Sequence, residues 1–363
     1  MYKKNIIFFL PNFSYGGAGN SILNICKYLN KKKYKIFVLS INKNFYKNEL
    51  SKYCQEVVEI NAVSTLLSLN KIRNYLKKFN KNETVIISNI NYANALFVIY
   101  FKIIYKFKLI LIERTPLQEL FTYFSFKDFI KKLFVKFIIK FFYNKADEVI
   151  ANSKKTANDF TKFTKKKCQY VYPLTLKKIG HYKRKKLNRE EVINCMTISR
   201  LSKEKNLIEI LSAMKNLNNK RIFFNIVGDG DEKNNLNRYI RENKIKSKIF
   251  NYSEKKKYKL FNICKLYICS SYFEGFPNAI VEALNNNIPI LSSNNYGGIN
   301  EILLNNKGGE TYKVGNKHDL INKINKVLNN YEYYTKKTFL AKKKLNRFTN
   351  NNIKKYEKII DQV

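Results

Sequence analysis

The feature that most constrains the fold is a regular alternation of short apolar runs with segments of helical spacing. In the first half of the chain the apolar runs, rich in β-branched and aromatic residues, occupy residues 5–10, 35–41, 84–88, 108–112, 147–151 and 169–172. Segments of helical spacing lie between most of these runs, near residues 21–29, 66–79, 92–105 and 127–143. Apolar strands that alternate with helices predict a parallel sheet covered on both faces.

A polar, basic stretch, PLTLKKIGHYKRKKLNREE, interrupts this pattern and is predicted to be a linker. Beyond it the pattern predicts strands at 192–199, 222–227, 265–270 and 288–292, and helices at 207–216, 233–242, 279–285 and 319–330. The predicted fold class is therefore α/β, with two Rossmann-like parallel domains facing across a ligand-binding cleft. The predicted parts are a first domain at 1–175, a linker at 176–190, a second domain at 191–340, and a C-terminal helix at 341–363 that could pack back on the first domain.

The composition of the 363-residue chain argues against several classes of protein. With 45% hydrophobic residues, both domains can bury a core. Only two histidines are present, His181 and His318, which argues against a histidine-built metal site or a histidine-centred triad. The six cysteines lack CxxC spacing and are expected to be reduced thiols packed as small apolar residues. No stretch reaches the roughly 18 uninterrupted apolar residues that a membrane span needs, and the N-terminal apolar run is too short for a signal peptide.

Two glycine-containing loops follow predicted strands. NFSYGGAGNS, at residues 12–21, includes Gly17 and precedes a predicted helix, so its backbone N–H groups could approach a phosphate. Simple packing of a strand against a helix is an equally good interpretation of these glycines. VGDGDE, at residues 227–232, contains Gly228 and by itself indicates only a tight turn.

A third loop, TISRLSKEKN at residues 197–206, carries Arg200 at the end of a strand and Lys205 at the start of a helix. Both could reach a pyrophosphate, Arg200 as a planar fork and Lys205 as a point charge. In a lysine-rich chain, solvated basic residues are the competing interpretation.

The fourth loop, SSYFEGFPNAIVEAL at residues 270–284, places two carboxylates around a turn. Glu274 lies on the loop, Pro277 suits the first position of a helix, and Glu282 lies one to two turns into that helix. Backbone N–H groups from Phe276 onward would point into the cleft. A carboxylate only accepts hydrogen bonds, which suits sugar hydroxyls, although a single glutamate on a helix is more often simply solvated.

These motifs, taken in order as SRLSKEKN, GDGD, EGFPNAIVE and GGINE, resemble those of the retaining glycosyltransferases of family 4 (glycosyl transferases group 1), which have the GT-B fold. The resemblance covers residues 1 to about 330 and is strongest from Thr197 to Glu301. In the first half only YGGAG and ADEVIANS resemble family motifs.

The resemblance implies a role for each matching residue. Arg200 and Lys205 would bind the donor diphosphate and stabilise the leaving nucleoside diphosphate, and Glu282 would hold the ribose hydroxyls. Glu274 would contact the transferred sugar. The remaining expected donor-binding positions are Gly17, which would cover the phosphate, Gly228 in the GxG turn, and the backbone of Gly275, Phe276, Pro277 and Asn278.

The expected chemistry is retaining transfer from a nucleotide sugar, with UDP and a hexose or N-acetylhexosamine preferred by family frequency. A front-face mechanism lets the leaving phosphate take the acceptor proton, so that no dedicated general base is needed. No cofactor and no metal are expected, because Arg200 and Lys205 can neutralise the diphosphate. Ser199 and Asn206 replace the family's usual glycines around these two residues.

The acceptor side is the least defined by sequence. At ERTP, residues 113–116, many family members place a histidine-containing segment, whereas Arg114 stands here. Arg114 could meet an acceptor phosphate, or it could form a salt bridge with Glu113 or another acid.

The segment from Lys127 to Lys145, KDFIKKLFVKFIIKFFYNK, is predicted to be a basic amphipathic helix. Lys132, Lys136 and Lys140 share one face, and Ile130, Leu133, Phe134, Phe137 and Phe141 form a neighbouring apolar stripe. Such a helix could dock on an anionic membrane, or it could face the core of the first domain with solvated lysines. We expect the former. The protein would then act peripherally on the inner face of the cytoplasmic membrane, on a lipid-linked or surface-polysaccharide acceptor.

The formal net charge of +42 also allows a nucleic-acid-binding protein, although no recognition module is legible and no nucleic-acid partner is expected. Codon bias toward Lys, Asn, Ile, Phe and Tyr could account for part of this charge. A nucleotide-sugar epimerase of the same fold is the other alternative.

Overall fold

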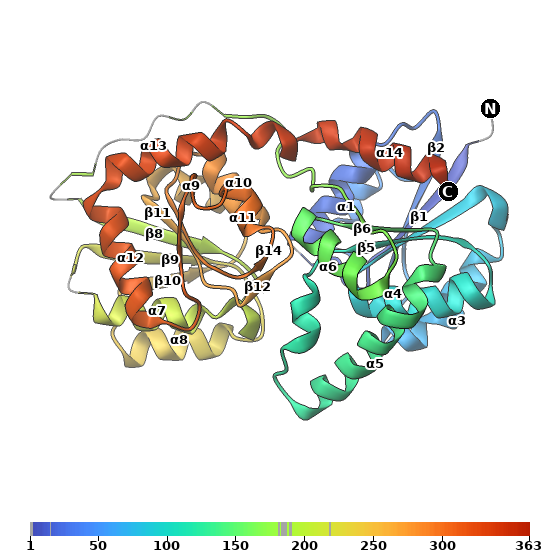
Figure 1. The fold of residues 1–363 in the computed structure, drawn as a ribbon, viewed down its shortest axis with the longest axis horizontal. Coiled ribbons are helices and arrows are strands. Elements are labelled where there is room, and N and C mark those ends of the chain that lie inside the picture. Colours follow the sequence, from blue (N-terminus) through green and yellow to red (C-terminus); the bar gives the residue numbers. More distant parts are fainter. Residues whose placement is uncertain (1–2, 15, 181, 183–186, 189–190, 218) are drawn as a thin grey trace. The chain divides into compact units, whose positions relative to one another are not determined.

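The computed structural model describes residues 3–14, 16–180, 182, 187–188, 191–217 and 219–363 (Figure 1). His181 and much of the predicted linker lie outside these residues. The chain forms two compact units. Unit 1 comprises residues 1–175 and 348–363, and unit 2 comprises residues 176–347.

Unit 1 contains a seven-stranded sheet with the order β3-β2-β1-β4-β5-β6-β7, in which every pairing is parallel. Its strands are β1 (Lys4–Phe9), β2 (Tyr34–Ser40), β3 (Glu56–Glu59), β4 (Thr84–Asn89), β5 (Lys108–Glu113), β6 (Glu148–Ala151) and β7 (Gln169–Tyr170). Alternate residues of a strand point to opposite faces. Accordingly Ile7 and Phe9 belong to one apolar cluster, while Ile6 and Phe8 belong to another on the opposite face.

Helices supply the outer layers of unit 1. They are α1 (Gly17–Tyr28), α2 (Lys47–Leu50), α3 (Thr65–Leu76), α4 (Asn91–Phe97), α5 (Phe126–Phe142), α6 (Lys154–Thr164) and α14 (Ile353–Gln362), with a π-helix at Val98–Ile104 and short 3₁₀ turns at Lys81–Glu83, Leu117–Phe121, Tyr143–Lys145 and Asn350–Asn352. In α14, Tyr356, Ile359 and Ile360 are buried in the same cluster as β1, β2 and α1.

Unit 2 contains a six-stranded parallel sheet with the order β10-β9-β8-β11-β13-β15. Its strands are β8 (Ile193–Ile198), β9 (Ile222–Val227), β10 (Ser247–Phe250), β11 (Leu266–Cys269), β13 (Ile290–Ser293) and β15 (Glu310–Tyr312), and a separate ribbon pairs β12 (Phe273–Glu274) with β14 (Tyr296–Gly297). Its helices are α7 (Leu207–Asn216), α8 (Lys233–Glu242), α9 (Glu254–Ile263), α10 (Asn278–Asn285), α11 (Ile299–Ile302), α12 (Lys317–Asn329) and α13 (Tyr331–Lys342), with 3₁₀ turns at Lys203–Lys205 and Leu345–Phe348.

The prediction of two parallel α/β domains is confirmed by these sheets. Three predicted helices differ from the structure. The predicted C-terminal helix at 341–363 is the end of α13, two 3₁₀ turns and α14. The segment 92–105 is not one α-helix but α4 followed by a π-helix, and α10 begins at Asn278, so Pro277 lies one residue before the predicted position. The prediction from sequence did not include the short strands β3, β10 and β15 or the helices α6 and α9.

Serine side chains define where several helices begin. Ser64, Ser125, Ser153 and Ser253 precede α3, α5, α6 and α9, and each side-chain oxygen accepts a hydrogen bond from a backbone N–H of the first turn. This capping satisfies a donor that the helix itself leaves unpaired.

Most of the cysteines are buried, as expected for thiols packed as small apolar residues. All six cysteines are free, and all but Cys54 are buried. Within the described part of the chain, none of the helices combines the length and the apolar character needed to cross a bilayer.

Candidate active site

Four loops of unit 2 meet at the carboxyl edge of its sheet. They follow β8, β9, β11 and β13, and these four strands are neighbours in the order β9-β8-β11-β13. The loops after β8 and β9 pack backbone against backbone, because Leu201 N donates to Asp229 O at 2.9 Å. A Cβ at Gly228 would lie 1.9 Å from Ser199 O, so this approach requires glycine.

Lys205 and Glu274, predicted from separate loops, are brought together. Lys205 Nζ lies 2.7 Å from Glu274 Oε1, and the two side chains are only 12% and 17% exposed. Ser271 Oγ donates to the same carboxylate oxygen at 2.8 Å. Ser270 Oγ donates to Lys205 O at 2.7 Å, which ties the two loops together. The pair therefore places the ammonium group of Lys205 beside a carboxylate that can accept further hydrogen bonds.

Arg200 is placed at the same edge but in a different environment. Its side chain is 62% exposed, and Nη2 contacts Glu204 Oε1 at 3.0 Å. Partial burial alone would raise the pKa of Glu204, but the hydrogen bond from Ser202 and the charge of Arg200 hold this pKa below its ordinary value. An exposed guanidinium on a surface ion pair is easily redirected toward an incoming anion.

The position of Glu274 depends on the two-stranded ribbon. In β14, Gly297 has φ of +120°, and a Cβ there would lie 1.5 Å from Glu274 O. Gly298 N then donates to Gly275 O at 3.0 Å. The GGINE motif therefore fixes the loop that carries Glu274.

Helix α10 carries Glu282 beyond this loop, and Phe276 and Pro277 lead into it as buried residues. Glu282 Oε1 accepts a hydrogen bond from Lys257 Nζ at 3.1 Å, and Lys257 is only 4% exposed. Burial raises the pKa of Glu282, while the charge of Lys257 opposes this rise. Burial alone would lower the pKa of Lys257, but Glu282 and other neighbouring groups raise it overall.

Lys257 was missed by the sequence analysis, although the sequence contains a signal for it. Its spacing of three, four and seven residues from Leu260, Phe261 and Cys264 puts it on the apolar face of α9. A lysine on such a face needs a buried acid as partner, and Glu282 supplies it.

Unit 1 carries Gly17 as the first residue of α1, directly after the loop that follows β1. Gly17 is exposed, and the neighbouring Gly16 N donates to Tyr46 Oη at 3.3 Å. The first N–H groups of a helix have no partner within the helix, which makes a helix start suited to anions.

Arg114 does not form the salt bridge with Glu113 that the sequence left open. Glu113 Oε1 instead accepts hydrogen bonds from Tyr143 Oη and from Asn94 Nδ2, at 2.5 and 2.7 Å. Arg114 Nε donates to Asn89 Oδ1 at 2.9 Å. Within the described ranges no carboxylate forms an ion pair with Arg114.

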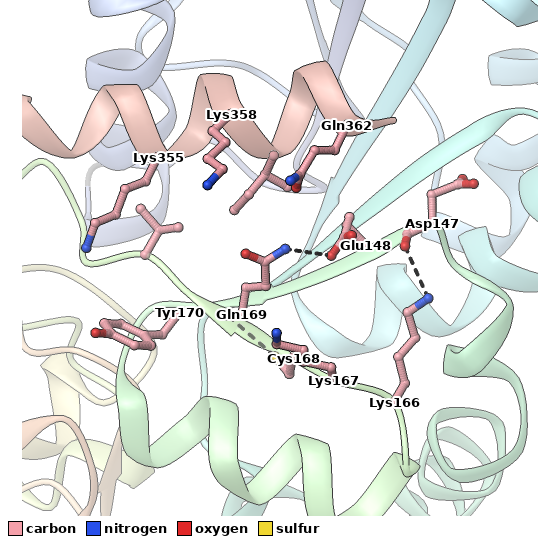
Figure 2. Close-up of a pocket in the computed structure, with 12 residues that line it drawn as sticks. Asp147, Glu148, Lys166, Lys167, Cys168, Gln169, Tyr170, Lys355, Lys358 and Gln362 are labelled. Atoms are coloured by element: carbon pink, nitrogen blue, oxygen red, sulfur yellow. Dashed lines mark hydrogen bonds between the residues drawn. The ribbon is translucent and has the colours of Figure 1, made fainter.

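A hollow of about 920 Å³ in unit 1 lies elsewhere (Figure 2). It is lined by Asp147, Glu148 and residues 166–171, with Lys355 and Lys358 of α14 on the other side. Asp147 and Glu148 stand at the start of β6, and Lys166 and Lys167 precede β7. In a parallel sheet these starts lie at the opposite edge from the loops after β1, β4 and β5, so the hollow is separate from the candidate residues.

No group of three or more His, Cys, Asp or Glu residues suited to a metal ion occurs in the part of the chain that the structure describes. Arg200 and Lys205 are cationic groups of this edge that the sequence predicted.

Each half of the chain matches a known protein family. Residues 180–355 match the family described as glycosyl transferases group 1, and residues 15–173 match glycosyltransferase family 4. The chain belongs to the group 1 glycosyltransferases. The solved structure of Anabaena HepE in complex with UDP and glucose is similar over 99% of this chain and 100% of its own, with a TM-score of 0.78 and 18% identity. The predicted GT-B fold is confirmed.

Two curated relatives match shorter stretches of this group 1 glycosyltransferase. One is the Campylobacter jejuni N-acetylgalactosamine-N,N'-diacetylbacillosaminyl-diphospho-undecaprenol 4-alpha-N-acetylgalactosaminyltransferase, 25% identical over 63% of this chain and 60% of the relative. The other is the Salmonella typhimurium lipopolysaccharide 1,6-galactosyltransferase, 29% identical over 28% of this chain and 30% of the relative. The chain thus spans less than two thirds of the length of either relative.

Proposed function

We propose that the protein is a retaining glycosyltransferase that moves a sugar from a nucleotide sugar to a lipid-linked or surface-polysaccharide acceptor. The observation that carries this proposal is the buried pair of Lys205 and Glu274 at the carboxyl edge of the unit 2 sheet. Family membership supports the reaction class.

The donor would be bound by the residues of this edge. Lys205 and the exposed Arg200 neutralise the diphosphate, and Glu282 accepts hydrogen bonds from the ribose hydroxyls. The sugar hydroxyls would contact Glu274 and the backbone from Gly275 to Asn278, while Gly228 offers close backbone approach. We propose UDP with a hexose or N-acetylhexosamine as the donor. HepE of Anabaena, which binds UDP and glucose, is consistent with this class.

The proposed reaction breaks the bond between the anomeric carbon and the leaving diphosphate and forms a bond to the acceptor oxygen on the same face. The acceptor hydroxyl gives its proton to the departing phosphate oxygen. Arg200 and Lys205 stabilise the negative charge that develops on the diphosphate. Because this charge can be balanced by two side chains, we propose that transfer needs no metal ion. Strong inhibition by a chelator, reversed by added metal, would disprove that part of the proposal.

The proposed acceptor is a saccharide carried by a lipid. The two curated relatives support this class, since one is named for a diphospho-undecaprenol acceptor and the other for lipopolysaccharide. The proposed location is the inner face of the cytoplasmic membrane.

Helix α5 supports docking of unit 1 on an anionic lipid surface. Its core face consists of Val135, Ile138 and Ile139. The predicted apolar stripe does not face the core, because its members remain 49–55% exposed: Ile130, Leu133, Phe134, Phe137 and Phe141. A row of exposed apolar side chains on a lysine-bearing helix matches the requirements of an interfacial helix.

The charge around this stripe has two parts. Lys132 donates to Thr122 O and Lys136 donates to Tyr123 Oη, so these two lysines hold the preceding segment against α5. Lys127, Lys131 and Lys140 are exposed. Each basic residue near an anionic leaflet contributes about 1 kcal/mol of binding free energy. These lysines therefore strengthen the membrane binding that burial of the apolar stripe provides.

The donor site is tested by thermal shift with a panel of nucleotide sugars on wild type, Glu282→Ala and, as a matched control on the surface of α8, Glu242→Ala. A bound donor raises the melting temperature according to its concentration relative to Kd. We expect one nucleotide sugar to stabilise wild type and Glu242→Ala but not Glu282→Ala. Absence of a shift with every donor would contradict the proposal.

The stereochemistry and the membrane surface need separate measurements. NMR of the product should show the same anomeric configuration as the donor.

In flotation assays, Phe134→Ser/Phe137→Ser should lose binding to vesicles that contain phosphatidylglycerol, whereas Leu67→Ser, which removes an exposed leucine of α3, should bind like wild type. Equal binding of both variants would exclude α5 as the docking surface.

A further inference from the structure

The guanidinium of Arg114 is a buried cation at the carboxyl edge of the unit 1 sheet, directly after β5. The residue is 9% exposed. Its Nε donates to Asn89 Oδ1, but Nη2 is buried and has no hydrogen-bond partner. A guanidinium stays protonated in proteins, so this charge cannot be removed by releasing a proton.

The neighbouring ionisable groups do not balance this charge. Glu113 directs its carboxylate to Tyr143 and Asn94 on the face of the sheet covered by α4, and burial raises its pKa to about 7. Tyr356 of α14 is the other neighbour, and burial raises the pKa of its phenol although Arg114 opposes the rise. Glu119, which faces Glu113, accepts a hydrogen bond from Asn91 and forms no ion pair with Arg114 among the described residues. A buried cation without a neighbouring anion costs free energy, and a ligand that brings a negative charge would offset this cost.

Two further residues beside Arg114 also carry a buried polar atom without a hydrogen-bond partner. Asn152, which follows β6, donates through Nδ2 to Arg114 O at 2.9 Å, while its Oδ1 is buried without a partner. Thr115 Oγ1 is likewise buried without a partner. Arg114 Nη2 and the Thr115 hydroxyl are unused donors, as an anionic oxygen would require. Asn152 Oδ1 is an unused acceptor, which suits a hydroxyl group of the same ligand.

We propose that Arg114 and Thr115 bind a phosphate group of the acceptor, with Asn152 accepting from a neighbouring hydroxyl. This inference rests on the proposed function and deepens it, because it assigns a charged chemical class to the acceptor. A planar guanidinium with a free Nη group is suited to a phosphate oxygen. The sheet positions the group through Asn89, whose Nδ2 donates to Phe9 O at 3.0 Å and which therefore directs Oδ1 toward Arg114.

The test uses the full chain in an Arg200→Ala/Lys205→Ala background, which removes both side chains proposed to bind the donor diphosphate. Inorganic pyrophosphate and geranyl diphosphate are titrated, with geraniol as the neutral control, and Kd is measured by calorimetry. Arg114→Gln should weaken both diphosphates about tenfold or more, since a charged hydrogen bond is lost. Arg73→Gln, which removes an exposed arginine stacked on Tyr105 in the same unit, should leave both values unchanged.

Each outcome decides the inference. Equal affinities in Arg114→Gln and Arg73→Gln would overturn it, as would binding of pyrophosphate without geranyl diphosphate, because the site would then take only a free anion. If Arg114→Gln fails to fold, Arg114→Lys keeps the cation and should bind with intermediate affinity. Binding by Arg114→Lys that equals the wild-type value would also overturn the inference.

Failure of the proposed function would be distinguishable from failure of this inference. The titration contains no nucleotide sugar, so it reports on Arg114 whether or not transfer occurs. If wild type transfers sugar, Arg114→Gln should raise the KM for a diphosphate-linked acceptor and leave the donor Kd unchanged. A fall in kcat with an unchanged acceptor KM would contradict phosphate binding by Arg114.

Discussion

Lys257 and Glu282 form the most consequential side-chain pair near the proposed ribose site. Both are largely buried, and Lys257 also contacts Glu254 Oε2 at 3.0 Å. A buried cation between two carboxylates orients Glu282 and opposes the rise in its pKa that burial causes. The geometry of a proposed donor ligand therefore depends on a lysine that does not itself need to touch the donor.

Lys257→Met should destabilise the protein and weaken donor binding together. Removal of one partner of a buried ion pair leaves Glu282 without its counter-charge, and we expect a loss of about 3 kcal/mol at neutral pH. Lys259→Met, an exposed change in the same helix, serves as the matched control. Urea unfolding measures the stability, and an equal midpoint for both variants would contradict this role of Lys257.

Glu113 makes the stability of unit 1 depend on pH. Burial raises its pKa from 4.5 to about 7, so between these values the folded protein holds a proton that the unfolded chain has released. Stability is therefore greatest below pH 4.5 and falls as pH rises to 7, by on the order of 3 kcal/mol for this group alone. Glu113→Gln keeps the acceptor oxygen for Tyr143 and Asn94 but cannot ionise.

We expect Glu113→Gln to be more stable than wild type at pH 8 and nearly equal to it at pH 5. Chemical unfolding at a series of pH values would measure the difference between the two proteins. A difference that stays constant over this range would show that the Glu113 carboxyl group does not titrate as its environment predicts.

Among the elements, the short ribbon of β12 and β14 places the strictest requirement on the sequence, because it needs glycine at position 297. It consists of two residue pairs, and the backbone of Gly297 contacts the carbonyl of Glu274. The sequence analysis identified GGINE as a motif that resembles the family, but it could not reveal the strand pairing. Two-residue strands contain no periodic pattern to read, because the pairing depends on residues 23 positions apart, as in Glu274 and Gly297.

Gly297→Ala should displace Glu274 and abolish donor binding. The added Cβ would meet Glu274 O at 1.5 Å, and the residue also has φ of +120°. Gly315→Ala is the matched control, because its φ of +80° imposes strain while no atom lies within 4 Å of the added Cβ. We expect a cost of about 1 kcal/mol for the control and clearly more for Gly297→Ala. Donor-induced thermal shifts that match in the two variants would contradict this account.

At the same scale, long periodic elements were predictable and short or irregular ones were not. The helix at 127–143 and the strands β1, β2, β4, β5, β8 and β9 have enough residues to display their apolar pattern. The helices α6 and α9 were missed although Ser153 and Ser253 mark their starts, because their lysine-rich faces hide the apolar spacing. Positions such as Arg114 and Lys257 depend on tertiary packing, so their burial could not be read from residue type.

The whole molecule joins distant parts of the sequence within one unit. Unit 1 consists of residues 1–175 and 348–363, so its core is completed only by the last helix. Ile359 and Ile360 of α14 pack with β1, β2 and α1, and Lys4 Nζ donates to Ile360 O at 3.0 Å. Asp361 accepts a hydrogen bond from Tyr34 Oη and forms an ion pair with Lys33. Unit 2, by contrast, is a continuous stretch of the chain.

This difference predicts unequal behaviour of the two units when the chain is divided. A fragment of residues 176–347 should unfold cooperatively by itself, because its core is contained in one segment. A fragment of residues 1–175 should be poorly folded, since Tyr356, Ile359 and Ile360 no longer cover their apolar partners. A synthetic peptide of residues 348–363 should restore its structure, and the same peptide with Ile359 and Ile360 replaced by Ser should not. Circular dichroism and urea unfolding would measure both effects. A urea midpoint of the 1–175 fragment that is unchanged by the native peptide would mean that α14 decorates unit 1 without completing its core.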